Sequence, residues 1–125
     1  MKLLVFFALA TTLWLSACSQ PPEVLARDSI VGAKAFLDKE KAAHPECATS
    51  KAGFCGFLSK ATGAKDVAID ALEAYCAGPA FDTGGACQAP LKGTATSTQL
   101  LNKLSAAIQG MNQTIADVKK AGGIQ

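Results

Sequence analysis

The chain has 125 residues, half of them hydrophobic, with 12 lysines and arginines against 10 acidic side chains and a formal net charge of +2 at pH 7. This near balance is not the clustered basic face of a nucleic-acid-binding domain, so we expect no nucleic-acid partner. Aromatic side chains make up only 6% of the chain, which favours closely packed helices over a sheet built on aromatic and β-branched residues.

The first segment of the chain is typical of an exported protein. Lys2 supplies a small positive region, and residues 3–15 are apolar apart from Thr11 and Thr12. This apolar run is shorter than the roughly 20 residues that a helix needs to cross a bilayer. We therefore expect residues 1–17 to be a signal peptide that is removed.

The end of this segment carries a second signal. Leu15-Ser16-Ala17-Cys18 resembles the lipobox of bacterial lipoproteins, over residues 1–19 only. The resemblance implies that Cys18 carries a diacylglycerol and becomes the mature N-terminus, and two or more acyl chains hold a protein stably on a membrane. Ser19, where an aspartate would signal inner-membrane retention, implies the periplasmic face of the outer membrane in a Gram-negative host. The alternative is an ordinary secretory leader with a cysteine near its cleavage site.

The four remaining cysteines indicate disulfides. An even number of cysteines in an exported chain is typical of a disulfide framework, here formed by Cys47, Cys55, Cys76 and Cys87. We favour the pairs Cys47–Cys55 and Cys76–Cys87, because both close short loops beside helix ends. The crossed pairs Cys47–Cys87 and Cys55–Cys76 remain open.

After a short tether over residues 18–22, the sequence predicts one helical domain over residues 23–125. The first helix is expected from Glu23 to Ala43, because Pro45 disfavours helical geometry in the residue before it. Its apolar positions recur every three or four residues and are Ala26, Ile30, Ala33 and Leu37, widened by Leu25 and Phe36.

Two shorter helices are expected in the middle of the chain. The first covers residues 50–61 and is weakened by Gly53 and Gly56; its apolar face consists of Phe54, Phe57, Leu58 and Ala61. The second covers residues 64–77 and buries Ile69, Leu72 and Cys76, with Gly78 as its C-terminal cap. Residues 79–95 then form an irregular segment rich in glycine and proline.

The last helix is expected over residues 97–120, with Thr96 and Gln99 as a capping box and Gly122 as the C-terminal cap. Its apolar seam has heptad spacing and comprises Leu101, Leu104, Ile108, Met111, Ile115 and Val118. This seam must pack on the first helix or on another molecule.

These elements predict an all-α fold, a small bundle of three to four helices stapled by two disulfides. The first and last helices would be the long walls, and the cysteine-bearing middle would cap one end.

The sequence contains no constellation that predicts catalysis. His44 and Cys47 are a potential metal pair at helical spacing, but a lone histidine before a proline is more often a helix-end residue, and no Cys-x-x-Cys is present. Asp66, Asp70 and Glu73 are best interpreted as a solvated helix face. We therefore expect no enzyme, no metal and no cofactor.

The sequence thus favours a membrane-anchored envelope lipoprotein that acts as a small structural or protein-interaction module with an envelope protein as partner. Phe81 and Asp82 are the candidate partner contacts. One alternative is a small apolar-ligand carrier with a cavity among Phe54, Phe57, Phe81 and Met111. Another is an inhibitor or immunity-type envelope lipoprotein.

Overall fold

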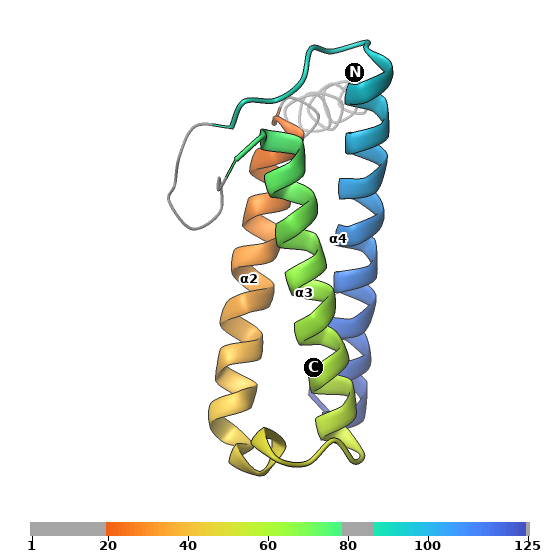
Figure 1. Ribbon diagram of the computed structural model, residues 1–125. Coiled ribbons are helices and arrows are strands. Elements are labelled where there is room, and N and C mark those ends of the chain that lie inside the picture. The colour runs from red at the N-terminus through yellow and green to blue at the C-terminus, as the bar shows by residue number, and fades with distance from the viewer. Residues whose placement is uncertain (1–19, 79–86, 125) are drawn as a thin grey trace, which may run out of the picture.

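A computed structural model describes residues 20–78 and 87–124. The described residues form three long helices and one short 3-10 helix, with no strand among them, so the all-α bundle is confirmed (Figure 1). The elements are α2 (Pro22–Ala43), η1 (Pro45–Ala48), α3 (Phe54–Cys76) and α4 (Ala95–Gly122). Along the bundle α2 and α4 run in one direction and α3 in the other. Among the described helices, none has the length and apolarity needed to cross a membrane.

Helix α2 follows the predicted boundaries within one residue. A proline at its first turn is preset for helical geometry, and the helix ends at Ala43, with His44 as its C-cap before Pro45. The stripe of Ala26, Ile30, Ala33 and Leu37 is buried. Leu25, expected to widen this stripe, is 47% exposed, because adjacent residues point about 100° apart around a helix.

The prediction of two short middle helices was wrong, because the structure has one continuous helix, α3. Glycine inside a helix costs only about 1 kcal/mol, and Gly63 lies between two buried stretches of the same helix face. Burial of Leu58 and Ala61 before it, and of Leu72 after it, outweighs that cost. The middle of the chain is therefore a full-length wall of the bundle and not a cap across one end.

The ends of α3 also differ from the prediction. The helix starts at Phe54 because Gly53 takes a φ of 58°, in the left-handed region that favours glycine. At the other end the left-handed cap is Ala77, with a φ of 56°, and not Gly78. Phe57 is 41% exposed and does not share the buried face of Leu58.

Helix α4 is longer than predicted, and both of its caps shift. Thr94 is the N-cap, and its side chain accepts a hydrogen bond of 3.1 Å from the Ser97 backbone N–H. Thr96 lies inside the helix, so the predicted capping box with Gln99 was wrong. The C-cap is Gly123, with a φ of 63°, one residue beyond Gly122.

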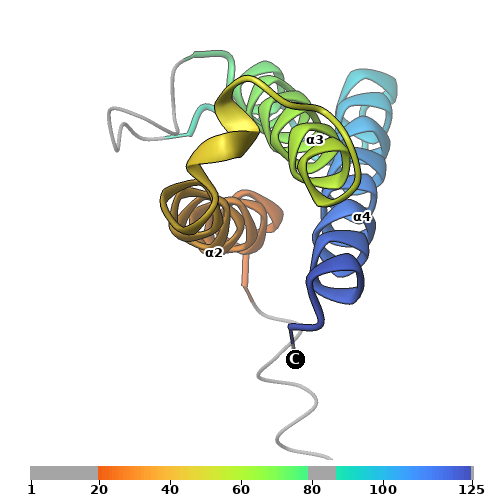
Figure 2. The same cartoon turned by 90° about the horizontal axis from the view of Figure 1, so that it is seen from below.

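The seam of α4 packs inside this chain, mainly on α3. Leu104, Met111 and Val118 are buried, and the remaining seam residues, Leu101, Ile108 and Ile115, are partly buried against the same core. Viewed from the end, the three helices form a triangle around this core (Figure 2). The seam therefore needs no second molecule to cover it.

Candidate functional site

The two ends of the bundle have different chemistry. We call one the Gln20 end; it contains the start of α2, the end of α3 at Cys76, and Cys87 and Thr94 before α4 (Figure 1). We call the other the η1 end; it contains η1 and the first turn of α3. Each end carries one disulfide.

Both disulfides are the short-range pairs favoured from the sequence. Cys47 and Cys55 are bonded with their Cα atoms 4.9 Å apart, and Cys76 and Cys87 with theirs 4.5 Å apart. A backbone hydrogen bond also joins the chain after Cys87 to the end of α3, because the Gln88 N–H donates to the Cys76 carbonyl at 3.1 Å. The crossed pairing is thereby excluded in this structure.

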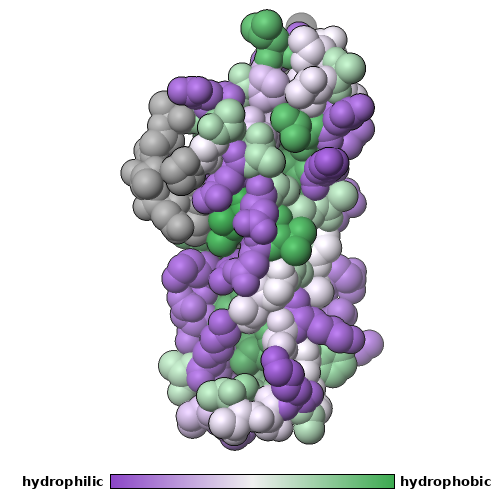
Figure 3. Space-filling model, in the orientation of Figure 1, coloured by the Kyte–Doolittle hydropathy of each residue, from purple (hydrophilic) through white to green (hydrophobic). Residues whose placement is uncertain are grey.

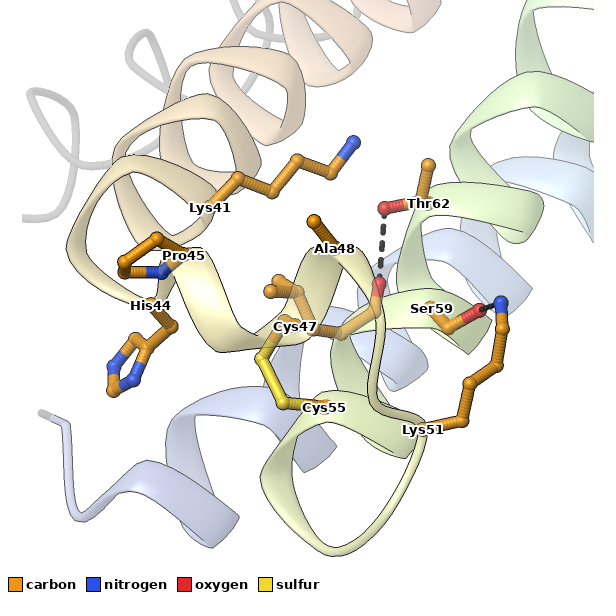
Figure 4. Close-up of a pocket in the computed structure, with 10 residues that line it drawn as sticks. Lys41, His44, Pro45, Cys47, Ala48, Lys51, Cys55, Ser59 and Thr62 are labelled. Carbon is orange, nitrogen blue, oxygen red and sulfur yellow. Dashed lines mark hydrogen bonds between the residues drawn. A yellow bond between two sulfur atoms is a disulfide. The ribbon is translucent and has the colours of Figure 1, made fainter.

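A partly open pocket of about 290 Å³ lies at the η1 end. Figure 4 shows its walls, which come from the end of α2, from η1 and from the first turns of α3. The lining residues are Lys41, His44, Pro45, Cys47, Ala48, Lys51, Cys55, Leu58, Ser59 and Thr62. The Cys47–Cys55 disulfide ties η1 to α3 and so holds these walls together.

The pocket carries positive charge and hydroxyl groups over an apolar floor. Lys41 and Lys51 stand at its sides, and the Lys51 ammonium donates to the Ser59 hydroxyl at 3.0 Å. The Thr62 hydroxyl donates to the Leu58 carbonyl at 2.9 Å. Such a surface suits an acidic group that carries apolar neighbours.

His44 connects the end of α2 to η1. Its Nδ1 lies 3.1 Å from Glu46 Oε1 and its Nε2 lies 3.8 Å from Glu40 Oε2. Its ring also packs against Phe54, with the ring centroids 4.5 Å apart. The pKa of Glu46 is lowered, first by a hydrogen bond to its own backbone N–H and then by His44. His44 is thus a helix-end residue, as its place before a proline indicated.

One group of potential metal ligands lies at the η1 end, but its chemistry does not suit a metal ion. Glu46, Cys47 and Cys55 have ligand atoms within 4.8 Å of one another. The two sulfur atoms are bonded to each other, whereas thiolate is the form that binds metal. The pair of His44 with Cys47 is unsuitable for the same reason.

Other candidate residues are dispersed. Asp66 is exposed and contacts Lys65 at 3.0 Å, and Asp70 is also exposed. Met111 lies in the core and Phe57 on the surface, so they do not line one cavity. Cys18, Phe81 and Asp82 lie outside the described residues.

Sequence reasoning missed two buried side chains. Glu40 is 7% exposed and Tyr75 is 5% exposed. Glu40 follows Leu37 by three residues and so continues the spacing of the buried α2 stripe. Because glutamate is charged, this spacing was not interpreted as a sign of burial. Burial raises the pKa of Tyr75, and the charge of nearby Glu23 adds to the rise.

Comparisons with protein-family models, curated proteins and solved structures find no match to this chain.

Proposed function

We propose that this chain is a lipid-anchored protein of the bacterial envelope that offers its η1 end to an envelope protein as an interaction surface. The observation that supports this most is the separation between the start of α2 and the pocket. Helix α2 has 22 residues, so it is about 33 Å long. A partner could therefore reach the pocket without competing with the membrane for the Gln20 end.

The tether adds to this argument. Three residues separate Cys18 from Pro22, and the two Cα atoms can be at most about 14 Å apart. A lipid on Cys18 would therefore keep the Gln20 end close to the bilayer. The η1 end would be the part of the bundle that extends furthest into the surrounding compartment, the periplasm in a Gram-negative host.

The chemistry of the pocket favours one kind of partner. Lys41 and Lys51 favour an acidic segment, and the apolar floor at Leu58 favours a hydrophobic side chain beside it. The covalent tie between Cys47 and Cys55 reduces the ordering cost of binding, because the walls are held before the partner arrives. Phe81 and Asp82, which lie between Cys76 and Cys87 in the sequence, are a second proposed contact.

The anchor is tested by intact mass of the protein purified from a bacterial host. We expect a diacylglyceride adduct on a chain that begins at Cys18, and recovery in the membrane fraction. The Cys18→Ala variant should lack the adduct and be recovered in the soluble fraction. A wild-type chain without the adduct would refute the anchor.

The interaction surface is tested by a photo-crosslinking residue placed at Ala48 on the η1 end, at Phe81, or at Ala106. Ala106 is an exposed position in the middle of α4 and is the matched control. We expect a specific adduct from Ala48 and none from Ala106. Adducts from Phe81 alone would move the interaction surface to the segment between Cys76 and Cys87, and equal yields from all three positions would refute an interaction module. A toxin or hydrolase in the adduct would assign the inhibitor role.

A further inference from the structure

The Gln20 end carries an outward-pointing apolar group that the core does not use. Leu91 is 80% exposed, and Val24 and Leu25 in the first turns of α2 are 40% and 47% exposed. Val24 and Leu25 lie near the start of α2, and Leu91 is hydrogen-bonded to the N-cap of α4. The starts of these two helices are at the same end of the bundle (Figure 1), where the space-filling view also shows hydrophobic surface (Figure 3). Leaving a leucine this exposed costs free energy unless something apolar covers it.

Leu91 is held in place by a short hydrogen-bonded turn. The Leu91 carbonyl accepts from the Thr94 backbone N–H at 3.3 Å and from the Thr94 hydroxyl at 2.7 Å. Gly93, with a φ of 81°, occupies the position of the turn that requires a positive φ. Because Thr94 is also the N-cap of α4, the turn is fixed to the bundle and Leu91 is presented in a set position.

We infer that Leu91, with Val24 and Leu25 at the same end of the bundle, contacts the surface of the lipid bilayer and sets the bundle upright on it. This inference rests on the proposed lipid anchor. The short tether selects the bilayer over other partners, because Pro22 can lie at most about 14 Å from the anchored residue. Side chains at the interface are buried ~5–10 Å into the headgroup and acyl boundary, which is within reach of an end held this closely.

The charges at this end agree with a bilayer contact. Lys92 is exposed next to Leu91, and Arg27 is exposed near the start of α2. Both side chains can keep their charge among the headgroups while their methylene stems lie along apolar surface. Glu23 and Asp28 balance them, so the contact would depend on apolar burial more than on anionic lipid.

The mature chain offers a clean optical test. Trp14 is the only tryptophan in the sequence and lies in the leader, so L91W would carry the only indole of the processed protein. V67W is the matched control, because Val67 is 58% exposed and lies nine residues before the end of α3, about 14 Å from the Gln20 end. Both variants are purified with the lipid adduct verified by mass and incorporated into phosphatidylcholine–phosphatidylethanolamine vesicles with brominated acyl chains.

We expect the L91W emission to shift to shorter wavelength and to lose intensity in brominated vesicles, with V67W unaffected. Equal quenching of both indoles would mean that the bundle lies along the membrane and would overturn the inference. An unquenched L91W indole in lipidated protein would mean that residue 91 does not reach the acyl chains, and would overturn the inference as well. Absence of the adduct from the wild-type chain would instead refute the proposed anchor, and this inference with it.

Discussion

His44 and Glu46 are in contact at the η1 end, where Nδ1 and Oε1 are 3.1 Å apart. The pKa of Glu46 lies below its ordinary value of 4.5, mainly through its own backbone N–H and then through His44. A carboxyl with a lowered folded pKa stabilises the fold above its unfolded pKa, and this contribution is lost as the pH falls through the folded pKa.

Glu46→Gln should therefore make the free energy of unfolding decline less steeply below about pH 4.5. The measurement is urea denaturation of wild type and variant at pH 7 and at several acidic pH values. Parallel curves for the two proteins would show that Glu46 does not contribute to acid sensitivity. The pKa of Asp38 is lowered by Lys34, so Asp38→Asn should likewise make the free energy of unfolding less dependent on acidic pH.

Leu104→Ala should lower the free energy of unfolding by about 2–5 kcal/mol, because it opens a cavity where α4 packs in the core. Leu104 is 2% exposed. Gln109→Ala, at an exposed position of the same helix, is the control and should change stability by less than about 0.5 kcal/mol. Equal effects in chemical denaturation would contradict the packing of this seam.

Thr94→Ala should cost about 1 kcal/mol, because it removes the side-chain acceptor of the Ser97 N–H. Thr96→Ala should be close to neutral, since Thr96 is exposed inside the helix. Thermal unfolding of the two variants separates the observed cap from the one expected from sequence. A larger loss of stability in Thr96→Ala than in Thr94→Ala would instead support the capping box of Thr96 with Gln99.

Two glycines of α3 should respond in opposite ways to alanine. A Cβ added at Gly63 would meet no side chain or neighbouring element within 4 Å, so Gly63→Ala should stabilise the protein by about 0.5–1 kcal/mol. A Cβ on Gly56 would lie 2.7 Å from the Lys51 carbonyl oxygen, so Gly56→Ala should destabilise. Similar gains for both would show that the 49–53 segment moves away from α3 freely.

Replacing Cys47 and Cys55 together by alanine should cost about 2–3 kcal/mol, the loop-closure value for a short loop. The Cys76 and Cys87 pair should cost a similar amount, because the sequence separations are 8 and 11. Only loss of the first pair should also reduce crosslinking from Ala48. Denaturation and crosslinking of both double variants, side by side, distinguish a stability effect from an effect on the pocket walls.

Strong periodicity predicted much of this fold. The α2 stripe and the α4 seam each repeat over several turns, so their helices and their buried faces were predicted nearly as found. The local disulfide pairs followed from the positions of cysteines next to helix ends. These features depend on neighbours along the chain, which a single sequence displays.

The errors arose where a weak local signal opposed packing. The prediction placed a gap at residues 62–63 between two helices, but the cost of Gly63 inside one helix is small beside the burial of Leu58 and Leu72. Three threonines precede or begin α4, and sequence alone does not choose Thr94 over Thr96 as the cap. The pocket depends on how η1 folds back on α3, which no periodic pattern encodes.

The disulfide bond between Cys76 and Cys87 closes the chain between these two residues into a covalent loop. A protease that cut within residues 77–86 would therefore release no fragment, and helix α4 would stay joined to α3 until a reductant opened the bond. In an oxidising compartment such a nicked molecule would keep its mass, apart from one added water, and would separate into two pieces only on a reducing gel.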